Sequence, residues 1–303
     1  MSNFVFNNPA FQQQDPRNVA TYPGAAQGQA AQAAQTGAAA HAGMDAAANA
    51  QLEGMYAAPP AGAIETDRMS VEDTVWKTAG LFAILLATAV VGWVWTLGGM
   101  RATPYSDITM TPWIVGALGG FVLAMVIIFT SRKKVRPALI FAYAAFEGLF
   151  IGGISAFFEA VWPGIVMQAT LATLAVVGVT LALFASGKIR ASKKMTKIFL
   201  IAMVGYLVFS LLNMVLMWTG VAPQAFGLRG VEIMGIPLGV IIGILVVFMA
   251  AYSLVLDFDQ IQQGVRNGAP RQYGWLGAFG IMVTVVWLYV EILRIIAILR
   301  GNN

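Results

Sequence analysis

The stretch WLGAFGIMVTVVWLYVEILRIIAIL, residues 275–299, decides the fold of this chain. It is longer than the roughly 20 apolar residues that a helix needs to cross the hydrocarbon core of a bilayer. The charged residues in it are Glu291 and Arg294. A charge inside a span is costly and usually marks a functional site or a tightly paired structural one. The stretch therefore predicts a transmembrane helix that carries a polar site.

Six further apolar runs upstream have the length of a membrane-spanning helix. They are residues 78–97, 113–130, 138–158, 165–184, 198–218 and 234–256. The composition agrees, because 58% of the 303 residues are hydrophobic and only 11% are charged, against roughly 25% charged residues in an ordinary soluble domain. The sequence therefore predicts an all-α, polytopic membrane protein, a bundle of seven transmembrane helices.

The basic residues gather in three of the loops between these runs. The second loop carries Arg132, Lys133, Lys134 and Arg136, the fourth carries Lys188, Arg190, Lys193, Lys194 and Lys197, and the sixth carries Arg266 and Arg271. Cytoplasmic loops of membrane proteins carry an excess of lysine and arginine. We therefore expect a cytoplasmic N-terminus and, after seven spans, a C-terminus outside the cell.

The first part of the chain differs from the rest. Residues 24–63 are mostly Ala, Gly, Gln and Pro, with few large apolar side chains. Such a segment cannot bury enough apolar surface to offset its ordering entropy. We expect a disordered tail over residues 1–68, without a cleaved signal peptide, and a membrane domain over residues 69–303. Ser70 can cap the first helix, and Asp73 lies in its first turn.

The composition excludes several kinds of site. The chain has no cysteine and a single histidine, His41, in the tail. Disulfides, thiolate metal sites, Ser-His-Asp triads and histidine metal clusters are therefore excluded. The net charge of +4 does not indicate nucleic-acid binding, because the basic residues are spread over membrane loops. Carboxylates, basic residues and backbone remain for chemistry, with the lipid bilayer as the expected partner.

Five acidic residues lie in or at the edges of the expected spans. They are Glu147, Glu159, Asp257, Asp259 and Glu291. Glu291 can form a local pair with Arg294, three residues on along the same helix, or meet another helix. Asp257 and Asp259 diverge by roughly 200° on a helix, so one should face the bundle and the other the cytoplasmic rim. Glu147 has no local cation, so it is either neutral or bonded to another helix.

Two carboxylates that meet in a poorly hydrated place cannot both ionise cheaply and tend to share a proton. Such a pair is a pH-responsive latch, because the protonated pair joins two helices and the deprotonated pair repels. Two anionic side chains are also a candidate cation site, and their oxygen ligands suit Ca²⁺. If the last span begins at Gly274, however, Glu291 lies about 25 Å along it, whereas Asp257 is near the cytoplasmic face. The two can meet only if the last span protrudes from the membrane or span six extends inward.

Three segments resemble motifs of the Bax inhibitor-1/YccA family. Residues 256–261, LDFDQI, are similar to its YD-x-x-Q segment in the sixth helix. Residues 288–296, LYVEILRII, resemble its LYLDxINLFLxLLRI signature in the seventh, and residues 146–149, FEGL, resemble its EGL. The resemblance covers about residues 70–300, and the VRNGAPRQYGWL segment at 265–276 resembles bacterial members. The chain departs from these motifs at Glu291, where the family has Asp, and at Leu256, where it has Tyr.

The resemblance implies a seven-helix bundle with the last helix at its centre, in the plasma membrane of a bacterium. It implies a proton-sensitive protein with a calcium leak, in which Asp257 and Glu291 form the hydrogen-bonded pair that senses pH. It also implies that a basic residue at the cytoplasmic end of the second helix, Arg132 or Lys133, interacts with the closed state. No cofactor is expected beyond H⁺ and Ca²⁺ as transported or regulatory ions.

The leading hypothesis is a passive, pH-gated cation pathway, with Asp257 and Glu291 as the latch and Glu147 beside the route. A proton-coupled secondary transporter that uses the same carboxylates is one alternative. Another is a non-transporting regulator that binds a membrane protease or other membrane protein through residues 1–68. We do not expect an enzyme, because no GxGD motif of an intramembrane aspartyl protease surrounds the acids.

Overall fold

The computed structural model describes residues 67–98, 108–221 and 226–301, so the predicted tail over 1–68 lies almost wholly outside the described residues. Within these ranges there are seven helices that are long and apolar enough to cross a membrane, as the sequence predicts. They are α3 (Val71–Thr96), α4 (Thr111–Ser131), α5 (Pro137–Val161), α6 (Ile165–Ala185), α7 (Lys193–Trp218), α8 (Leu238–Arg266) and α9 (Gly274–Gly301).

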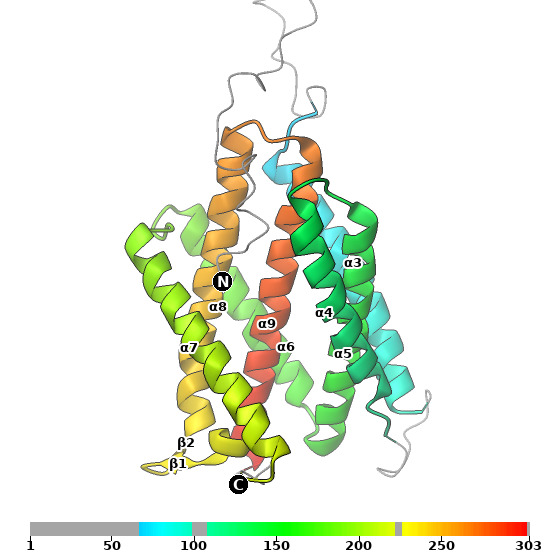
Figure 1. Ribbon diagram of the computed structural model, residues 1–303, viewed down its shortest axis with the longest axis vertical. Helices are drawn as coiled ribbons and strands as arrows, with labels where there is room; N and C mark the ends of the chain where they lie inside the picture. The colour runs from blue at the N-terminus through cyan, green and yellow to red at the C-terminus, as the bar shows by residue number, and fades with distance from the viewer. Residues whose placement is uncertain (1–66, 99–107, 222–225, 302–303) are drawn as a thin grey trace, which may run out of the picture.

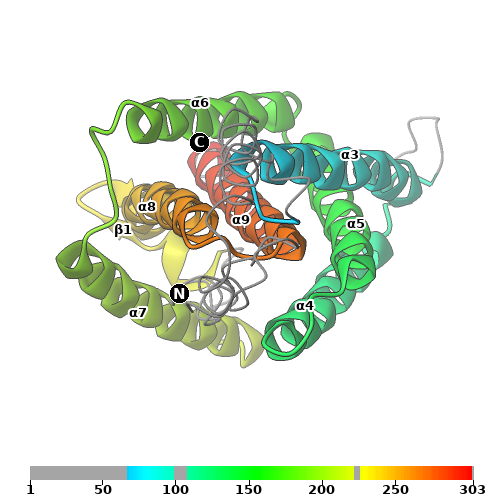
Figure 2. The same cartoon turned by 90° about the horizontal axis from the view of Figure 1, so that it is seen from above.

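The last helix, α9, lies at the centre of the bundle (Figure 2). It packs against α3, α5, α6 and α8, and it is buried along most of its length, from Leu276 at one end to Ile298 at the other. By contrast, α7 has two buried residues, Phe199 and Asn213. The polar residues of α9 are therefore held inside protein, whereas α7 stands at the periphery with most of its length exposed.

Close helix approach through glycine organises the side of the bundle formed by α3, α4 and α5. A Cβ atom on Gly152 of α5 would lie 2.0 Å from the carbonyl oxygen of Ala89 in α3. A Cβ on Gly116 of α4 would lie 2.3 Å from the backbone nitrogen of Phe150 in α5. Small residues of this kind let membrane helices pack backbone to backbone. The three helices therefore form a rigid unit beside α9.

The sixth span differs from its expected boundaries of residues 234–256. Met234 and Gly235 have positive φ angles of 55° and 79° and form the turn between two short strands, β1 (Glu232–Ile233) and β2 (Ile236–Pro237). Helix α8 begins directly after Pro237, because proline has no N–H and favours the first positions of a helix. The helix then continues to Arg266, ten residues beyond the expected end.

This extension makes α8 and α9 a hairpin that rises beyond the ends of the other helices (Figure 1). Its turn contains the short 3₁₀ helix η5 (Arg271–Tyr273). The turn lies at the same end of the bundle as the basic segments 132–136 and 188–194 (Figure 1). The last span thus begins as a protruding helix. This is one of the two arrangements that, by the sequence analysis, would allow Asp257 and Glu291 to meet.

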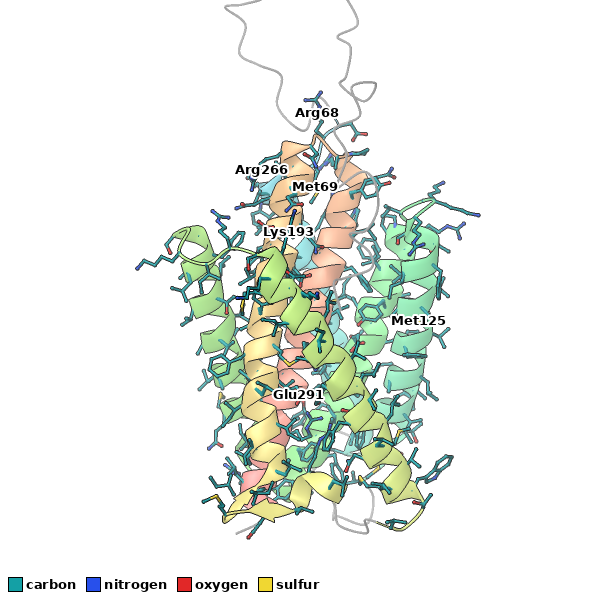
Figure 3. The ribbon with its side chains drawn as sticks, turned by 60° about the vertical axis from the view of Figure 1, so that its left-hand side comes forward. Arg68, Met69, Met125, Lys193, Arg266 and Glu291 are labelled. Carbon is teal, nitrogen blue, oxygen red and sulfur yellow. The ribbon has the colours of Figure 1, made fainter. Side chains whose placement is uncertain are left out.

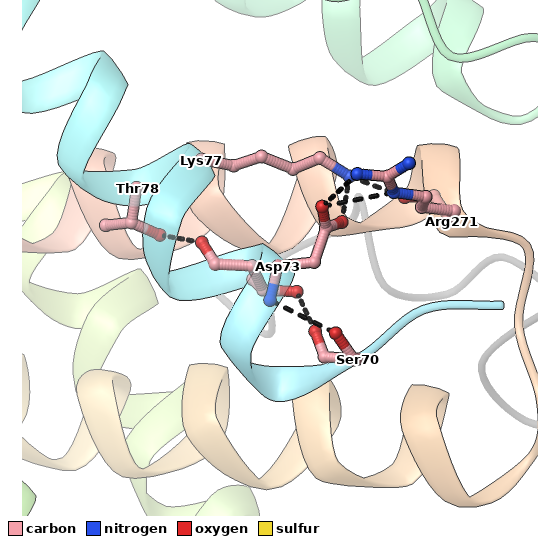
Figure 4. A network of polar contacts seen from close by, with 6 residues as sticks. Ser70, Asp73, Lys77, Thr78 and Arg271 are labelled. Carbon is pink, nitrogen blue, oxygen red and sulfur yellow. Dashed lines mark hydrogen bonds and ion pairs between the residues drawn. The ribbon is translucent and has the colours of Figure 1, made fainter. Parts of the chain in front are cut away.

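A polar staple joins the start of α3 to the turn of this hairpin (Figure 4). Ser70 caps α3 by accepting a bond from the backbone N–H of Asp73 (3.1 Å), as the sequence predicts. The Asp73 carboxylate forms ion pairs with Lys77 and with Arg271, whose Nη2 is 2.8 Å from Oδ1. Lys77 also donates to the carbonyl oxygen of Arg271 (2.8 Å). The backbone N–H of Met69 bonds to Ala269 (2.8 Å) on the same turn.

We expect Asp73→Asn to loosen this staple, because the amide cannot pair with both cations. The midpoint of thermal unfolding should fall by roughly 2–4 °C, and amide exchange should accelerate in residues 267–273. Glu72→Gln is the matched control, because Glu72 is an exposed acid of the same helical turn. An equal effect of both substitutions would show that net charge, and not the staple, is responsible.

Candidate functional site

Among the described residues, Asp257 is one of two carboxyls buried between helices at the centre of the bundle. It lies on α8, its residue is 1% exposed, and its Oδ2 accepts a hydrogen bond of 2.6 Å from the hydroxyl of Thr284 on α9. Ser253, one turn earlier on α8, lies with its hydroxyl 3.5 Å from the same threonine oxygen. Asp257 thus bonds to the central helix through a neutral hydroxyl.

Asp259, two residues further along α8, faces another direction. It is partly exposed, and its Oδ2 accepts a bond of 2.9 Å from the side-chain amide of Gln263. The roughly 200° between positions i and i+2 of a helix accounts for this divergence. Of the two aspartates, only Asp257 is placed to influence the interior of the bundle.

Glu291 is the second buried carboxyl, and charged partners surround it. Its residue is 2% exposed, and it lies in the half of the bundle that ends at β1 and β2 (Figure 3). It forms an ion pair with Arg294 on the same helix and accepts a hydrogen bond from the hydroxyl of Tyr206 on α7. Arg294 in turn donates to the same hydroxyl (2.6 Å). The local pair that the sequence left open is formed, and α7 completes it.

Arg229 extends this group toward the end of the bundle. It belongs to the 3₁₀ helix η4 (Gly227–Gly230) between α7 and α8. Its Nη2 lies 2.8 Å from the hydroxyl of Ser210 and 3.4 Å from that of Tyr206. Its guanidinium also lies 5.5 Å from the ring centroid of Phe209. We call Tyr206, Arg229, Glu291 and Arg294 the Tyr206 cluster.

The register of the hairpin separates Asp257 from Glu291. Ile261 contacts Gly277, and Gly243 contacts Ile295. In this antiparallel register Asp257 lies level with residue 281 and Glu291 level with residue 247. The two acids are therefore ten residues, or about 15 Å of helical rise, apart.

The bonds described above accordingly join the two carboxyls to different partners, Thr284 for Asp257 and the Tyr206 cluster for Glu291. A direct latch would require α8 and α9 to slide by almost three turns. The structure therefore does not bring the two acids together in this conformation, even though the hairpin protrudes, and their direct pairing stays a prediction.

A cavity of about 340 Å³ lies between the two carboxyl sites. Its lining includes Thr284 and Ser253, which surround Asp257, and Tyr206, which binds Glu291. Ser210 lines this cavity and also a second one of about 620 Å³ beside η4. A chain of hydroxyls and cavities thus runs along one side of α9, from Asp257 toward the end of the bundle that carries η4.

The other predicted site residues lie elsewhere. Glu147 is half-buried on α5 and faces α4, where a Cβ on Gly120 would lie 3.1 Å from its Oε1. Tyr143, one turn earlier, interacts with its carboxyl. Arg132 and Lys133 are exposed at the end of α4, so their interaction with a closed state stays a prediction. Glu147 is placed to join α4 to α5, away from the cavities beside α7.

Glu159 has a local structural role. Its two carboxylate oxygens accept bonds from the backbone N–H groups of Gly164 (2.6 Å) and Val166 (3.0 Å). These donors belong to the turn before α6 and to its first residues, where helix N–H groups lack partners in the backbone. Glu159 therefore fixes the connection between α5 and α6.

The sites at Asp257 and Glu291 each offer a calcium ion a single carboxylate ligand among the described residues. Among the described residues, no three His, Cys, Asp or Glu side chains gather as a metal site would require. Ca²⁺ prefers six to eight oxygen ligands, and Asp257 and Glu291 stand at separate levels. The hydroxyls of Thr284 and Ser253 could supplement Asp257 as neutral ligands.

Sequence reasoning missed three residues that complete these sites. Thr284 and Tyr206 are polar-tipped residues inside apolar runs, and Arg229 is the single basic residue of the fifth loop. A search for hydroxyl groups in the spans would have highlighted the first two among many others. Their partners could not be identified without the packing of α7 and α8 against α9.

We expect Tyr206→Phe to destabilise the protein more than Tyr289→Phe. The first substitution removes a hydroxyl that binds Glu291 and two arginines, and leaving such buried groups without a partner costs roughly 1–3 kcal/mol. The second removes a single neutral bond to Ser155. Thermal unfolding of the two purified variants in the same detergent makes the comparison. A smaller effect at Tyr206 would contradict the role assigned to its hydroxyl.

Comparison with known proteins places this arrangement in a family. The chain matches the family model described as Bax inhibitor 1 like over residues 8–301. No curated protein and no solved structure matches it. The match covers nearly all of the chain and agrees with the motifs and the seven apolar helices. The chain therefore belongs to the Bax inhibitor 1-like family of membrane proteins.

Proposed function

We propose that this protein is a pH-sensitive membrane protein that mediates a passive cation leak, with Ca²⁺ as the cation and without enzymatic activity. The observation that supports the proposal most directly is the cavity between Asp257 and Glu291. It reaches Thr284, which binds one carboxyl, and Tyr206, which binds the other. A cation that follows this cavity passes oxygen ligands at both levels of the central helix.

Asp257 is the gating group in this proposal. We assign a protonated Asp257 to the closed bundle, in which the residue is 1% exposed and its carboxyl bonds Thr284 (2.6 Å). When the proton leaves, the carboxylate is stabilised by water or by a cation that enters the cavity. A rise in pH therefore favours the hydrated, conducting state, and a fall in pH favours closure.

Glu291 has a different role in this proposal. Its charge is compensated by Arg294, and Tyr206 links that pair to α7. The Tyr206 cluster therefore connects the peripheral helix α7 to the central helix beside the cavity. A direct pair between Glu291 and Asp257, which the family resemblance implies, would belong to another conformation in which α8 and α9 have shifted.

The proposed orientation is that of a multi-pass protein in the plasma membrane of a bacterium, with the N-terminus cytoplasmic and the C-terminus outside. The basic segments 132–136 and 188–194 lie at the end of the bundle that carries the α8–α9 turn (Figure 1). An excess of basic residues on one side indicates the cytoplasmic face. The end with η4, β1 and β2 is then the outer end.

Flux from liposomes tests the proposal. The purified full chain, reconstituted into vesicles loaded with a calcium dye, should give a leak that rises several-fold as the pH is raised from about 6 to about 8, the range in which a perturbed carboxyl can titrate. Empty vesicles under the same calcium gradient are the control. A leak absent throughout this range would instead favour a non-transporting regulator of a membrane protease or other membrane protein.

We expect Asp257→Asn to keep the leak low and independent of pH, because the amide cannot ionise. Asp259→Asn is the matched control, since Asp259 bonds Gln263 at the partly exposed face of the same helix, and it should retain the pH response. An unchanged pH profile in Asp257→Asn would reject the assignment of the gate. Glu291→Gln, measured in the same way, should abolish the response only if the direct carboxyl pair forms in another conformation.

Removal of residues 1–66 tests whether this segment takes part in the leak. The cut leaves Asp67 and Met69, whose backbones bond the α8–α9 turn. The leak should be unchanged if the membrane domain carries it. Loss of the leak, at unchanged protein incorporation, would show that the tail is part of the pathway or its gate.

A further inference from the structure

A cavity of about 620 Å³ opens beside α7 at the end of the bundle that carries η4. Its lining consists of Ser210, Asn213, Met214, Met217, Trp218 and Arg229. Three of these six side chains, those of Met214, Met217 and Trp218, are apolar, and Trp218 is 90% exposed at the end of its helix. Tryptophan is enriched where the hydrocarbon core meets the headgroups. In the proposed orientation an interfacial Trp218 would place this cavity at the level of the lipid headgroups.

The side chains around this cavity carry more positive than negative charge. The Tyr206 cluster contains two guanidinium groups, those of Arg229 and Arg294, but one carboxylate, Glu291. That carboxylate is already bound by Arg294 and Tyr206. Within the described part of the chain, no Asp or Glu forms an ion pair with Arg229. A positive charge in such surroundings is costly unless an anion compensates it.

Within the described ranges, the hydrogen bonds of Arg229 leave part of its guanidinium without protein partners. Both of its bonds, to Ser210 (2.8 Å) and Tyr206 (3.4 Å), use Nη2. Its Nε is buried and has no hydrogen-bond partner among the described residues. Arginine presents its donors in a fork that matches the oxygens of phosphate. The free donors and the missing negative charge therefore point to the same kind of ligand.

The 3₁₀ helix η4, which carries Arg229, is held against α7 by the protein itself. The side-chain oxygen of Asn213 on α7 accepts a bond of 2.7 Å from the backbone N–H of Leu228. Gly227 has φ of 59°, and a Cβ there would lie 2.5 Å from that oxygen. Helix η4 thus fits closely onto α7. A preorganised donor binds its ligand at a lower entropic cost.

We propose that this cavity binds the phosphate of a phospholipid headgroup, with Arg229 as the main donor and the Ser210 hydroxyl beside it. The glycerol and the start of the acyl chains lie against Met214, Met217 and Trp218. An anionic lipid supplies the negative charge that the Tyr206 cluster lacks. The apolar lining favours a lipid over free phosphate, which would leave these three side chains uncovered. In the proposed orientation the lipid belongs to the outer leaflet.

Binding to the purified full chain in a non-ionic detergent tests this proposal. Short-chain dihexanoyl-phosphatidylglycerol and sodium phosphate are titrated separately, and the midpoint of thermal unfolding is recorded. We expect saturable stabilisation by the lipid. Arg229→Gln should weaken it about tenfold or more, as loss of a charge-assisted phosphate contact predicts. Arg300→Gln is the matched control, because Arg300 lies near the same end but bonds Pro163 and Gln168, and it should bind as the wild type does.

Two further variants keep the test decisive if Arg229→Gln does not fold. Arg229→Lys retains the charge but not the fork, and Ser210→Ala removes the neighbouring hydroxyl, so both should weaken lipid binding. Wild-type affinity in the Arg229 variants, or no saturable binding at all, would overturn the proposal. Saturation by sodium phosphate at the same concentrations would overturn the assignment to a lipid. None of these measurements depends on the calcium leak, so the two proposals fail separately.

Discussion

The structure depends on how a carboxylate is accommodated inside a bilayer. Glu291 lies within the most buried helix, and an ionised group there must be paired and hydrogen-bonded. Arg294 supplies the charge from the same helix, and Tyr206 supplies a hydroxyl from α7. Because α7 buries few residues of its own, this polar contact adds to the apolar packing of Phe199 in linking α7 to the centre. A buried acid in α9, Glu291, thus helps to determine how α7 is attached to the bundle.

The two buried carboxyls illustrate how surroundings divide the roles of chemically similar groups. Glu291 has a cation at a distance that allows it to remain charged. Asp257 bonds the hydroxyl of Thr284 on the central helix, and Thr284 and Ser253 line the neighbouring cavity. Asp257 thus lies beside a space that water or a cation could enter, whereas Glu291 lies beside a guanidinium group. This asymmetry is the reason why the proposed gate is placed at Asp257.

The sequence predicted the seven helices and the start of α3 at Ser70, because hydropathy and capping are local signals. It offered the pair of Glu291 with Arg294, at i,i+3 spacing, as one of two alternatives. It misplaced the start of α8, since an apolar run does not reveal the turn at Met234 and Gly235. The separation of Asp257 and Glu291 along the bundle depends on the register between α8 and α9, which no local sequence pattern encodes. Tyr206 and Arg229 meet them only through tertiary packing. The site was thus predictable in its acids and not in their partners.

The proposed leak and the proposed lipid site meet at Ser210, which lines both cavities. A cation that moves from Asp257 toward the end with η4 approaches two guanidinium groups and one carboxylate. The excess positive charge there opposes its passage, and the opposition is strong where the dielectric constant is low. A lipid phosphate bound to Arg229 would cancel this excess. The lipid composition of one leaflet would then adjust the electrostatic barrier at the exit, while protonation of Asp257 controls the entrance.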